Sequence, residues 1–393
     1  MSLPSPLSRP PGLYKMVDRD LATVSAEQII GAAKTGWKRL HPGTAWPGIV
    51  DAVVGGPPCQ GFSVCGKRAE GDGRNEQLRH FVRLVVAIRP RVFAMENVAG
   101  LLEMRFDSLR EGALGELRRA GYRLEGADSY INAVDFGVPQ ARKRVVVLGS
   151  LDSVDMPTLR PKGTLTTVRD ALDGLPTIRS YRALLNRDAT RLNEVDAARR
   201  HSSQSPYARV LAGLDHDRND HGYIRTWDAD VITSSLRTVH QATVVQRFRR
   251  TKPGTVEPRS RLFRLSLDGV SRTLRAGTGS ERGSHTSPRP IHPVHARVIT
   301  VREAARLHGY PDWFRFHVTN WHGHRQVGNS VPPPLARAAG QAMLEALGVR
   351  PSTPDLVEPL GDERWLKANR LQAAAIVDAD VNQLPLPRAR VVI

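Results

Sequence analysis

The sequence is poor in cysteine and contains no long apolar run. Only two cysteines, Cys59 and Cys65, occur among 393 residues, too few for a disulfide framework. No run of about 18 apolar residues is present, so no membrane-spanning helix is expected. The opening residues MSLPSPLSRPPGLYK lack the apolar core of a secretion signal. We therefore expect a cytoplasmic protein without a membrane partner, in which a thiol can stay reduced.

Acidic side chains are scarce relative to basic ones. The chain contains 57 lysines and arginines against 39 acidic residues, which gives a formal net charge of +18. Such an excess favours a polyanionic partner, most simply nucleic acid, and would associate the protein with the nucleoid. The alternative is a generally arginine-rich proteome. Charge of this kind describes partners and does not determine the fold.

The first 150 residues alternate between strand and helix patterns. Two amphipathic stretches predict helices at 75–90 and 107–122, the first with Leu78, Phe81 and Val82 on one face. Short apolar runs predict strands at 48–56, 91–98, 122–131 and 144–150. This alternation indicates an α/β fold with a largely parallel sheet.

The pattern is lost between about 155 and 290, where apolar runs are short and Arg, Asp, Ser, Thr, Gly and Pro are frequent. A separate, irregular domain is expected there. Order returns where Thr300 and Glu303 form the pattern of a capping box, before a short helix that stops at Pro311. A further helix is predicted at 331–348. The tail from 351 is expected to contain at most one more helix, and no internal repeat is found.

Polar residues gather where the predicted strands end. Cys59 follows a strand through the rigid sequence GGPP, a setting that suits a nucleophile, although a buried small apolar role is the alternative. Glu96 lies in the ENV sequence that closes the next strand. Arg142 and Arg144 precede a third strand, and alternate residues of an extended segment face the same side. Because groups at the carboxyl ends of neighbouring parallel strands converge on one crevice, we expect Cys59 and Glu96 to lie close together, and the two arginines to point to the same side.

These segments resemble the cytosine-5 DNA methyltransferases. The matching segments are GGPPCQGFS, ENV, DFGVPQARKR, RVITVREAARLHGYP and QVGNSVPP, in the family's order. They cover 48–150 and 290–345, roughly two fifths of the chain. The resemblance implies a Rossmann-like S-adenosylmethionine-dependent domain with a smaller, irregular target-recognition domain, and double-stranded DNA in the cleft between them.

The resemblance also implies a mechanism. The Cys59 thiolate adds to C6 of a flipped cytosine, and carbon 5 then accepts the methyl group of S-adenosylmethionine. Glu96 bonds N3 and the exocyclic amine. Arg142 bonds O2 of the base, and Arg144 supports the active-site loop. No metal is expected.

The remaining site residues follow from the same resemblance. Pro57, Asn329 and Ser330 are expected at the cofactor, together with Asp20. Gln60 and Ser63 lie on a Gly-rich loop after Cys59 that is expected to contact DNA; a plain solvated loop is the alternative.

The stretch 247–264 contains several basic residues and interleaved phenylalanines, and could contact phosphates and base edges. Its candidates are Arg247, Arg249 and Arg250. A solvated basic surface is the alternative. Arg297 and Glu303 are assigned a structural role.

One family feature is not recognisable. The family's first strand, its Gly-rich cofactor loop and the acid that follows have no counterpart before Cys59. The chain is therefore a fragment, which we favour, or a half-enzyme completed by a complementary subunit, or a degenerate protein that binds DNA without methylating it. An RNA cytosine-5 methyltransferase is a further alternative.

Taken together, the sequence predicts a sequence-specific DNA (cytosine-5-)-methyltransferase of a restriction-modification system, with a cognate restriction endonuclease as a partner. Four parts are expected. They are a first catalytic part at 1–155, the target-recognition domain at 156–290, the closing catalytic part at 291–350 and a tail at 351–393.

Overall fold

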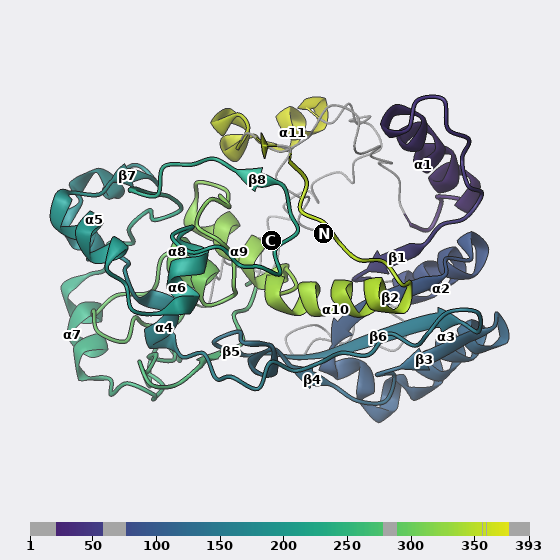
Figure 1. Ribbon diagram of the computed structural model, residues 1–393. Helices are drawn as coiled ribbons and strands as arrows, with labels where there is room; N and C mark the ends of the chain where they lie inside the picture. The colour runs from purple at the N-terminus through teal and green to yellow at the C-terminus, as the bar shows by residue number, and fades with distance from the viewer. Residues whose placement is uncertain (1–20, 58–75, 278–288, 356, 359, 377–393) are drawn as a thin grey trace.

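The computed structural model describes residues 21–57, 76–277, 289–355, 357–358 and 360–376. Within these ranges, no helix combines the length and apolar character needed to cross a bilayer. Figure 1 shows a sheet and its helices on the right, and a part rich in short helices and irregular chain on the left.

The main sheet has the strand order β1–β2–β6–β3. Its strands are β1 (Ala52–Gly55), β2 (Val92–Val98), β6 (Lys143–Leu151) and β3 (Tyr122–Glu125), and the short β4 (Ile131–Asn132) also pairs with β6. β1 and β2 are parallel, whereas β6 runs antiparallel to its neighbours β2, β3 and β4. The expectation of a largely parallel sheet is therefore wrong. The chain returns from β3 to β6 without an α-helix, and only a parallel pair requires a long crossover.

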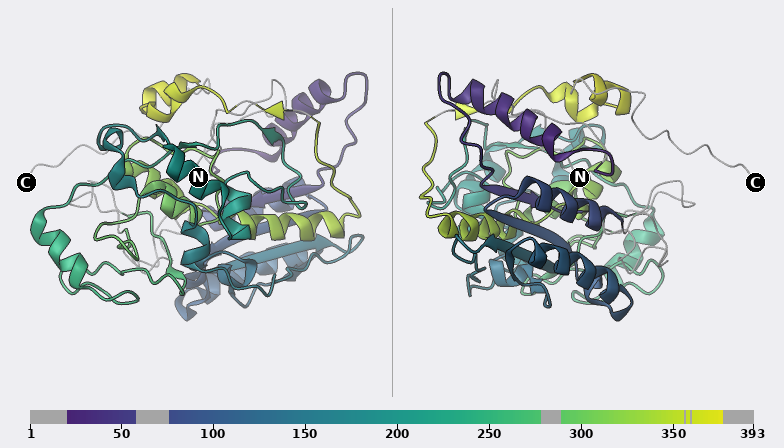
Figure 2. Two further views of the ribbon diagram at one scale, coloured as in Figure 1. Left: turned by 60° about the vertical axis from the view of Figure 1, so that its left-hand side comes forward. Right: turned by 90° about the vertical axis from the view of Figure 1, so that its right-hand side faces the viewer.

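Helices cover both faces of this sheet (Figures 1 and 2). The predicted helices are confirmed as α2 (Glu76–Ile88), α3 (Asp107–Arg119) and α10 (Pro333–Ala346). Phe93 and Met95 of β2 pack toward α2 and α3, and their neighbours Val92 and Ala94 pack toward α10. This alternation is that of a strand buried on both faces. Helix α10 thus brings the late part of the chain back onto the early sheet.

The region after β6 is built from short elements. Its helices are α4 (Val168–Leu172), α5 (Glu194–His201), α6 (Pro206–Leu211) and α7 (Ala242–Arg250). A second apolar core joins α4 to α8 (Val301–Arg306) and α9 (Asn320–Asn329). The predicted capping box of α8 is confirmed, since the Glu303 amide donates to Thr300 Oγ1 over 3.2 Å. The short strands are β5 (Gln140–Ala141), β7 (Thr190–Arg191), β8 (Ile224–Arg225), β9 (Val231–Ile232), β10 (Ser271–Arg272) and β11 (Val357–Glu358).

Two features at the ends of the described chain add to the prediction. Helix α1 (Ala26–Leu40) was not predicted, although a capping box of Ser25 and Gln28 marks its start. It packs on α2 through a small apolar cluster. The described part of the tail contains one α-helix, α11 (Arg370–Ile376), as expected. Among the described strands β1 pairs with β2 alone, and its Val54 is 65% exposed.

Candidate active site

The ends of β1 and β2 and the start of β6 meet at one edge of the sheet. Because β6 is antiparallel to β2, its first residues lie opposite the last residues of β2, and Arg144 pairs in register with Val98. Glu96 Oε1 lies 2.7 Å from Arg144 Nε, and the two side chains are 22% and 10% exposed. A charged pair so enclosed holds the carboxylate in a fixed orientation.

The chain that leaves β1 passes directly over this carboxylate. A Cβ atom added to Gly56 would lie 3.5 Å from Glu96 Oε2. The Asn97 amide donates to the carbonyl of Pro57 over 3.4 Å. Cys59 follows Pro57 by two residues in the sequence and lies outside the described residues, as do Asp20, Gln60 and Ser63.

The hydrogen bonds and ion pairs found among the described residues join the two predicted arginines to different partners. Arg142 is 2% exposed, and its guanidinium donates to the carbonyls of Leu274, Gly328 and Ser330 over 3.0–3.1 Å. Residue 142 lies between β5 and β6, and β5 pairs with β10 instead of the main sheet. The alternation of a single strand therefore does not extend from residue 142 to residue 144.

The end of α9, with Ser330 just after it, is closely packed apart from one side chain. A Cβ atom at Gly328 would lie 2.5 Å from backbone atoms of Arg275 and Ala276, so only glycine fits there without a shift. Ser330 is buried and Asn329 is exposed. This segment therefore presents the Asn329 side chain from a fixed backbone.

Two buried side chains far apart in the sequence also reach this segment. Gln140 Nε2 lies 2.9 Å from His308 Nδ1, and His308 Nε2 lies 3.1 Å from the Ser330 carbonyl. Neither residue was among the predicted site residues. Gln140 lies in the quoted segment DFGVPQARKR, two residues before Arg142. Its polar side chain interrupts the apolar sequence FGVP–A, and this interruption is the signal by which the sequence could have identified it.

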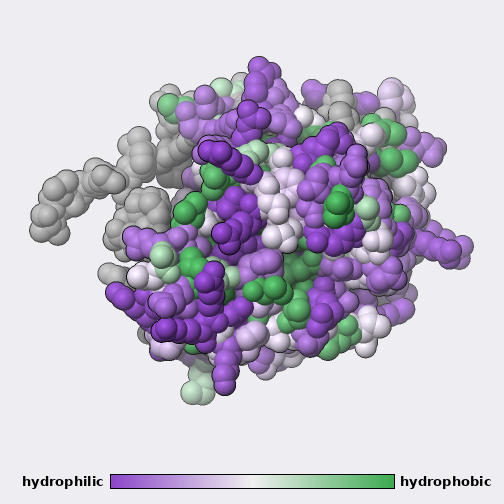
Figure 3. Space-filling model, turned by 90° about the vertical axis from the view of Figure 1, so that its left-hand side faces the viewer, coloured by the Kyte–Doolittle hydropathy of each residue, from purple (hydrophilic) through white to green (hydrophobic). Residues whose placement is uncertain are grey.

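The predicted basic stretch divides into surface and interior residues. Arg249 and Arg250, at the end of α7, are exposed, while Arg247 lies 3.5 Å from the buried Glu257. Phe248 packs inward. Arg264, from the same stretch, is buried and donates to backbone carbonyls, so it is a structural residue. Figure 3 views the side of the molecule with α5 and α7, and hydrophilic residues cover most of it.

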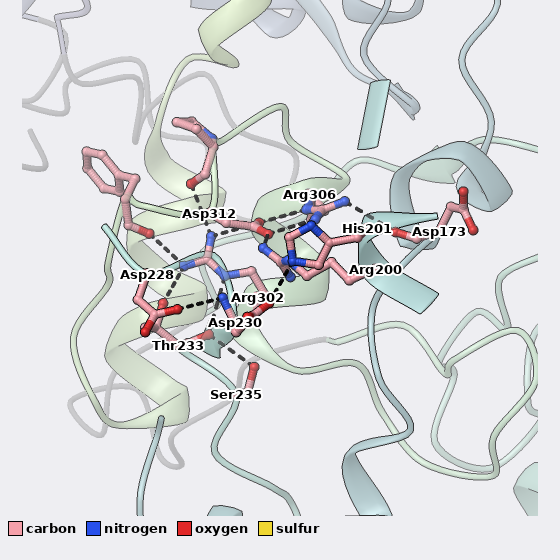
Figure 4. Close-up of polar contacts among 12 residues, drawn as sticks. Asp173, Arg200, His201, Asp228, Asp230, Thr233, Ser235, Arg302, Arg306 and Asp312 are labelled. Carbon is pink, nitrogen blue, oxygen red and sulfur yellow. Dashed lines mark hydrogen bonds and ion pairs between the residues drawn. The ribbon is translucent and has the colours of Figure 1, made fainter. Parts of the chain in front are cut away.

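A buried ion cluster joins the irregular region to α8 (Figure 4). Asp312 accepts two hydrogen bonds from Arg306, both over 2.7 Å, and also contacts Arg200. Arg302 lies 3.6 Å away and donates to Thr233. Burial alone would raise the pKa of Asp312, but the nearby guanidiniums of Arg306, Arg200 and Arg302 outweigh it and hold this pKa well below the usual range. None of these residues was among the predicted site residues.

Arg297 and Glu303 form a second buried pair beside it. Two hydrogen bonds of 2.8 and 2.6 Å join the guanidinium to the carboxylate. Burial opposes the ionised carboxylate, but Arg297 prevails and lowers the pKa of Glu303 to about 2. The structural role predicted for both residues is consistent with these contacts.

Comparison with known proteins decides the family. The model of the C-5 cytosine-specific DNA methylase family matches residues 28–345. The chain belongs to this family. It is 44% identical over 327 residues to the Type II methyltransferase M.XorII of Xanthomonas oryzae pv. oryzae, which covers 83% of this chain and 76% of that protein. It is 33% identical to M1.HphI of Haemophilus parahaemolyticus, over 75% of this chain and 68% of that protein.

A solved structure agrees with the sequence relatives. A protein described as a candidate DNA modification methyltransferase encoded within an E. coli prophage matches 84% of this chain and 86% of its own, with a TM-score of 0.64 and 31% identity. The predicted family and its Rossmann-like methyltransferase fold are confirmed. The chain is a DNA cytosine methyltransferase, and the non-catalytic and RNA-specific alternatives are not favoured. Methyltransferases of this family use S-adenosylmethionine and act on DNA.

Proposed function

We propose that the chain methylates carbon 5 of cytosine through a covalent intermediate on Cys59, with the target base flipped out of double-stranded DNA. One observation supports this most directly. The Glu96–Arg144 pair lies under Gly56. The next residue, Pro57, accepts a hydrogen bond at its carbonyl from the side chain of Asn97, the neighbour of Glu96. The residues that lead into Cys59 therefore pack against the Glu96 carboxylate, whose orientation is held by Arg144.

Each residue has a distinct task in this proposal. The Cys59 thiolate adds to C6, which makes carbon 5 nucleophilic, and Glu96 bonds N3 and the exocyclic amine as charge develops on the ring. S-adenosylmethionine, when bound, supplies the electrophilic methyl group. Loss of the C5 proton then releases the thiolate. Because the Arg142 guanidinium is occupied by three carbonyls, we assign the O2 contact to Arg144, which lies beside Glu96, and give Arg142 the supporting role. This assignment reverses the initial one.

The described residues fit one side of a cofactor site. The segment 328–330 is locked in place and exposes Asn329, and the backbone at Pro57 approaches the same sheet edge. We propose that Pro57, Asn329 and Ser330 contact S-adenosylmethionine, with Asp20 a further candidate outside the described residues.

We propose that DNA is read by the region 156–290, between the catalytic parts at 1–155 and 291–350. Arg249 and Arg250 are exposed at the end of α7. The negative end of the helix dipole stabilises cations there, and their guanidiniums, unlike the helix end itself, suit phosphate contacts. Arg247, Gln60 and Ser63 are further candidates. The Type II names of the relatives support a restriction-modification context with a cognate endonuclease, and with it a cytoplasmic, nucleoid-associated location.

The two cysteines provide a matched test. Cys59→Ser replaces the thiol by a much weaker nucleophile and is expected to abolish methyl transfer from radiolabelled S-adenosylmethionine to mixed-sequence DNA, with DNA binding kept. Cys65→Ser makes the same change six residues away and is expected to keep transfer. Substantial transfer by Cys59→Ser would remove Cys59 from the nucleophile role.

The wild-type chain in the same assay separates the alternatives. Label recovered as 5-methylcytosine shows a complete cofactor site. Transfer that appears only with upstream coding sequence or a complementary subunit shows a fragment or a half-enzyme. DNA binding without transfer under every condition indicates a degenerate enzyme, and preferential labelling of tRNA indicates an RNA substrate.

A further inference from the structure

Gln140 and His308 form a buried relay to the backbone of Ser330. Both side chains are 0% exposed. They connect β5, the chain just after α8 and the residue just after α9. Their sequence positions lie 168 residues apart, so the folded chain must be complete before the relay can form.

The hydrogen bonds of Gln140 fix the orientation of its amide. The backbone N–H of Leu274 donates to Gln140 Oε1 over 2.9 Å, and a backbone N–H can only donate. The oxygen therefore faces Leu274. The NH₂ group faces the carbonyl of Leu307 at 3.3 Å and His308 Nδ1 at 2.9 Å.

This orientation determines the tautomer of His308. An amide NH₂ group donates and does not accept, so Nδ1 of the imidazole must be the acceptor. The proton of the neutral ring then lies on Nε2, which donates to the carbonyl of Ser330 over 3.1 Å. Burial, with the positive charges of Arg142 and Arg144, holds the pKa of His308 well below its usual range. A second ring proton would lie on Nδ1 and point at the NH₂ group of Gln140, which can only donate.

Two donors therefore meet on one carbonyl. Arg142, which follows β5, donates to the Ser330 carbonyl through Nη2 over 3.0 Å. His308, two residues after the end of α8, donates to it through Nε2 over 3.1 Å. Tyr310 stacks beside the imidazole with ring centroids 6.0 Å apart. The carbonyl of Ser330 is thus held by side chains from two separate parts of the chain. Ser330 directly follows the exposed Asn329.

We propose that His308 is a positioning residue for the methyl donor. Its Nε2–H tautomer, selected by Gln140, fixes the carbonyl of Ser330 and so the presentation of Asn329. This inference rests on the proposed function, in which Asn329 contacts S-adenosylmethionine. A histidine that only fills space would need neither a fixed tautomer nor a bond to this segment.

The first test reads the tautomer directly, without activity. The wild-type chain with ¹⁵N-labelled histidine is examined by NMR, and the His308 signals are assigned by their loss in His308→Gln. Expected are a hydrogen-bearing Nε2, a bare Nδ1 and no change between pH 8 and pH 5.5. A proton on Nδ1, or titration in this range, would overturn the proposal.

The second test separates positioning from structure. His308→Leu removes the donor to Ser330 and is expected to raise the Kd and KM for S-adenosylmethionine about tenfold, the effect of one lost hydrogen bond. The kcat at saturating cofactor and the affinity for DNA should change little. His308→Gln can accept and donate in the same directions and should restore most of the affinity. The exposed His216→Gln is the control and should match the wild type.

Each other result decides against the proposal. A loss of kcat and folded fraction with an unchanged Kd in His308→Leu would make the residue merely structural. If His308→Leu does not fold, His308→Asn, whose shorter amide cannot span both partners, takes its place. Absence of S-adenosylmethionine binding by the wild type would defeat the proposed function and the positioning role with it, whereas the NMR result would still stand as a statement about the ring.

Discussion

Replacement of Asp312 by asparagine should destabilise the junction between the irregular region and α8 by about 3–5 kcal/mol, the cost of breaking a buried ion pair from one side. Arg200 is 1% exposed, and among the described residues the hydrogen bonds of its guanidinium go to Asp312 alone. Arg306 would lose two charge-assisted bonds. Arg302 would keep its bonds to Thr233 and to backbone carbonyls, so its loss is smaller.

Urea denaturation followed by tryptophan fluorescence measures this effect, with Trp313 adjacent to the substituted residue. Asp268→Asn is the matched control, because Asp268 also pairs with an arginine, over 2.6 Å, but its side chain is 80% exposed. That change should cost no more than about 1 kcal/mol. Equal midpoints for the two variants would refute the reasoning.

A double variant identifies the source of the cost. If Asp312→Asn destabilises because Arg200 is left charged and buried, then adding Arg200→Met removes that charge and should recover part of the loss. An additive or greater loss in the double variant would show that the cost comes from elsewhere in the cluster.

Three further measurements follow from the structure. Burial lowers the pKa of His292 to about 4 and of His324 to about 3, so both stay neutral in the native state while the unfolded chain takes up protons below about pH 6.5. Between pH 6 and pH 5 the free energy of unfolding should therefore fall by about 1.2 kcal/mol for each histidine. Equal urea midpoints at these two pH values would contradict this. Gly328→Ala places a Cβ atom 2.5 Å from backbone atoms and should lower the free energy of unfolding by about 1–3 kcal/mol. In the same urea titration Gly340→Ala, in helix α10, is the control: its Cβ atom would meet nothing within 4 Å, so the change should be neutral or stabilising. Neutralising Arg249 and Arg250 should weaken DNA binding. It should also reduce the steepness of the slope of log affinity against log salt concentration by up to about two; an unchanged slope would exclude both residues as phosphate contacts.

The sequence was sufficient for features encoded locally. The helices at α2, α3 and α10, the Thr300 capping box and the polar ends of the strands all follow from patterns within one or two turns. Glu96 was named because strand ends converge, and Arg144 because it precedes a strand in alternation with Arg142. The structure places Glu96 Oε1 and Arg144 Nε 2.7 Å apart, a pairing that was not predicted. The roles proposed for Cys59 and for the cofactor and DNA residues stay predictions.

The errors and omissions concern long-range pairing. The antiparallel course of β6 depends on a return from β3 that periodicity does not encode. Arg142 turns away from Arg144 because β5 pairs with β10, more than 130 residues later. The same holds for Arg200 and Asp312, 112 residues apart. Each contact is decided by which segments meet in the folded chain, and no local pattern reports that.

The outer edge of β1 has a consequence for handling the protein. Its backbone N–H and C=O groups pair with no described strand, and Val54 adds an apolar side chain at the same place. Such an edge accepts a strand from any molecule that offers one. Pairing between such edges is favoured as the protein concentration rises. Protein concentration is therefore a variable to be fixed before activities of this chain are compared.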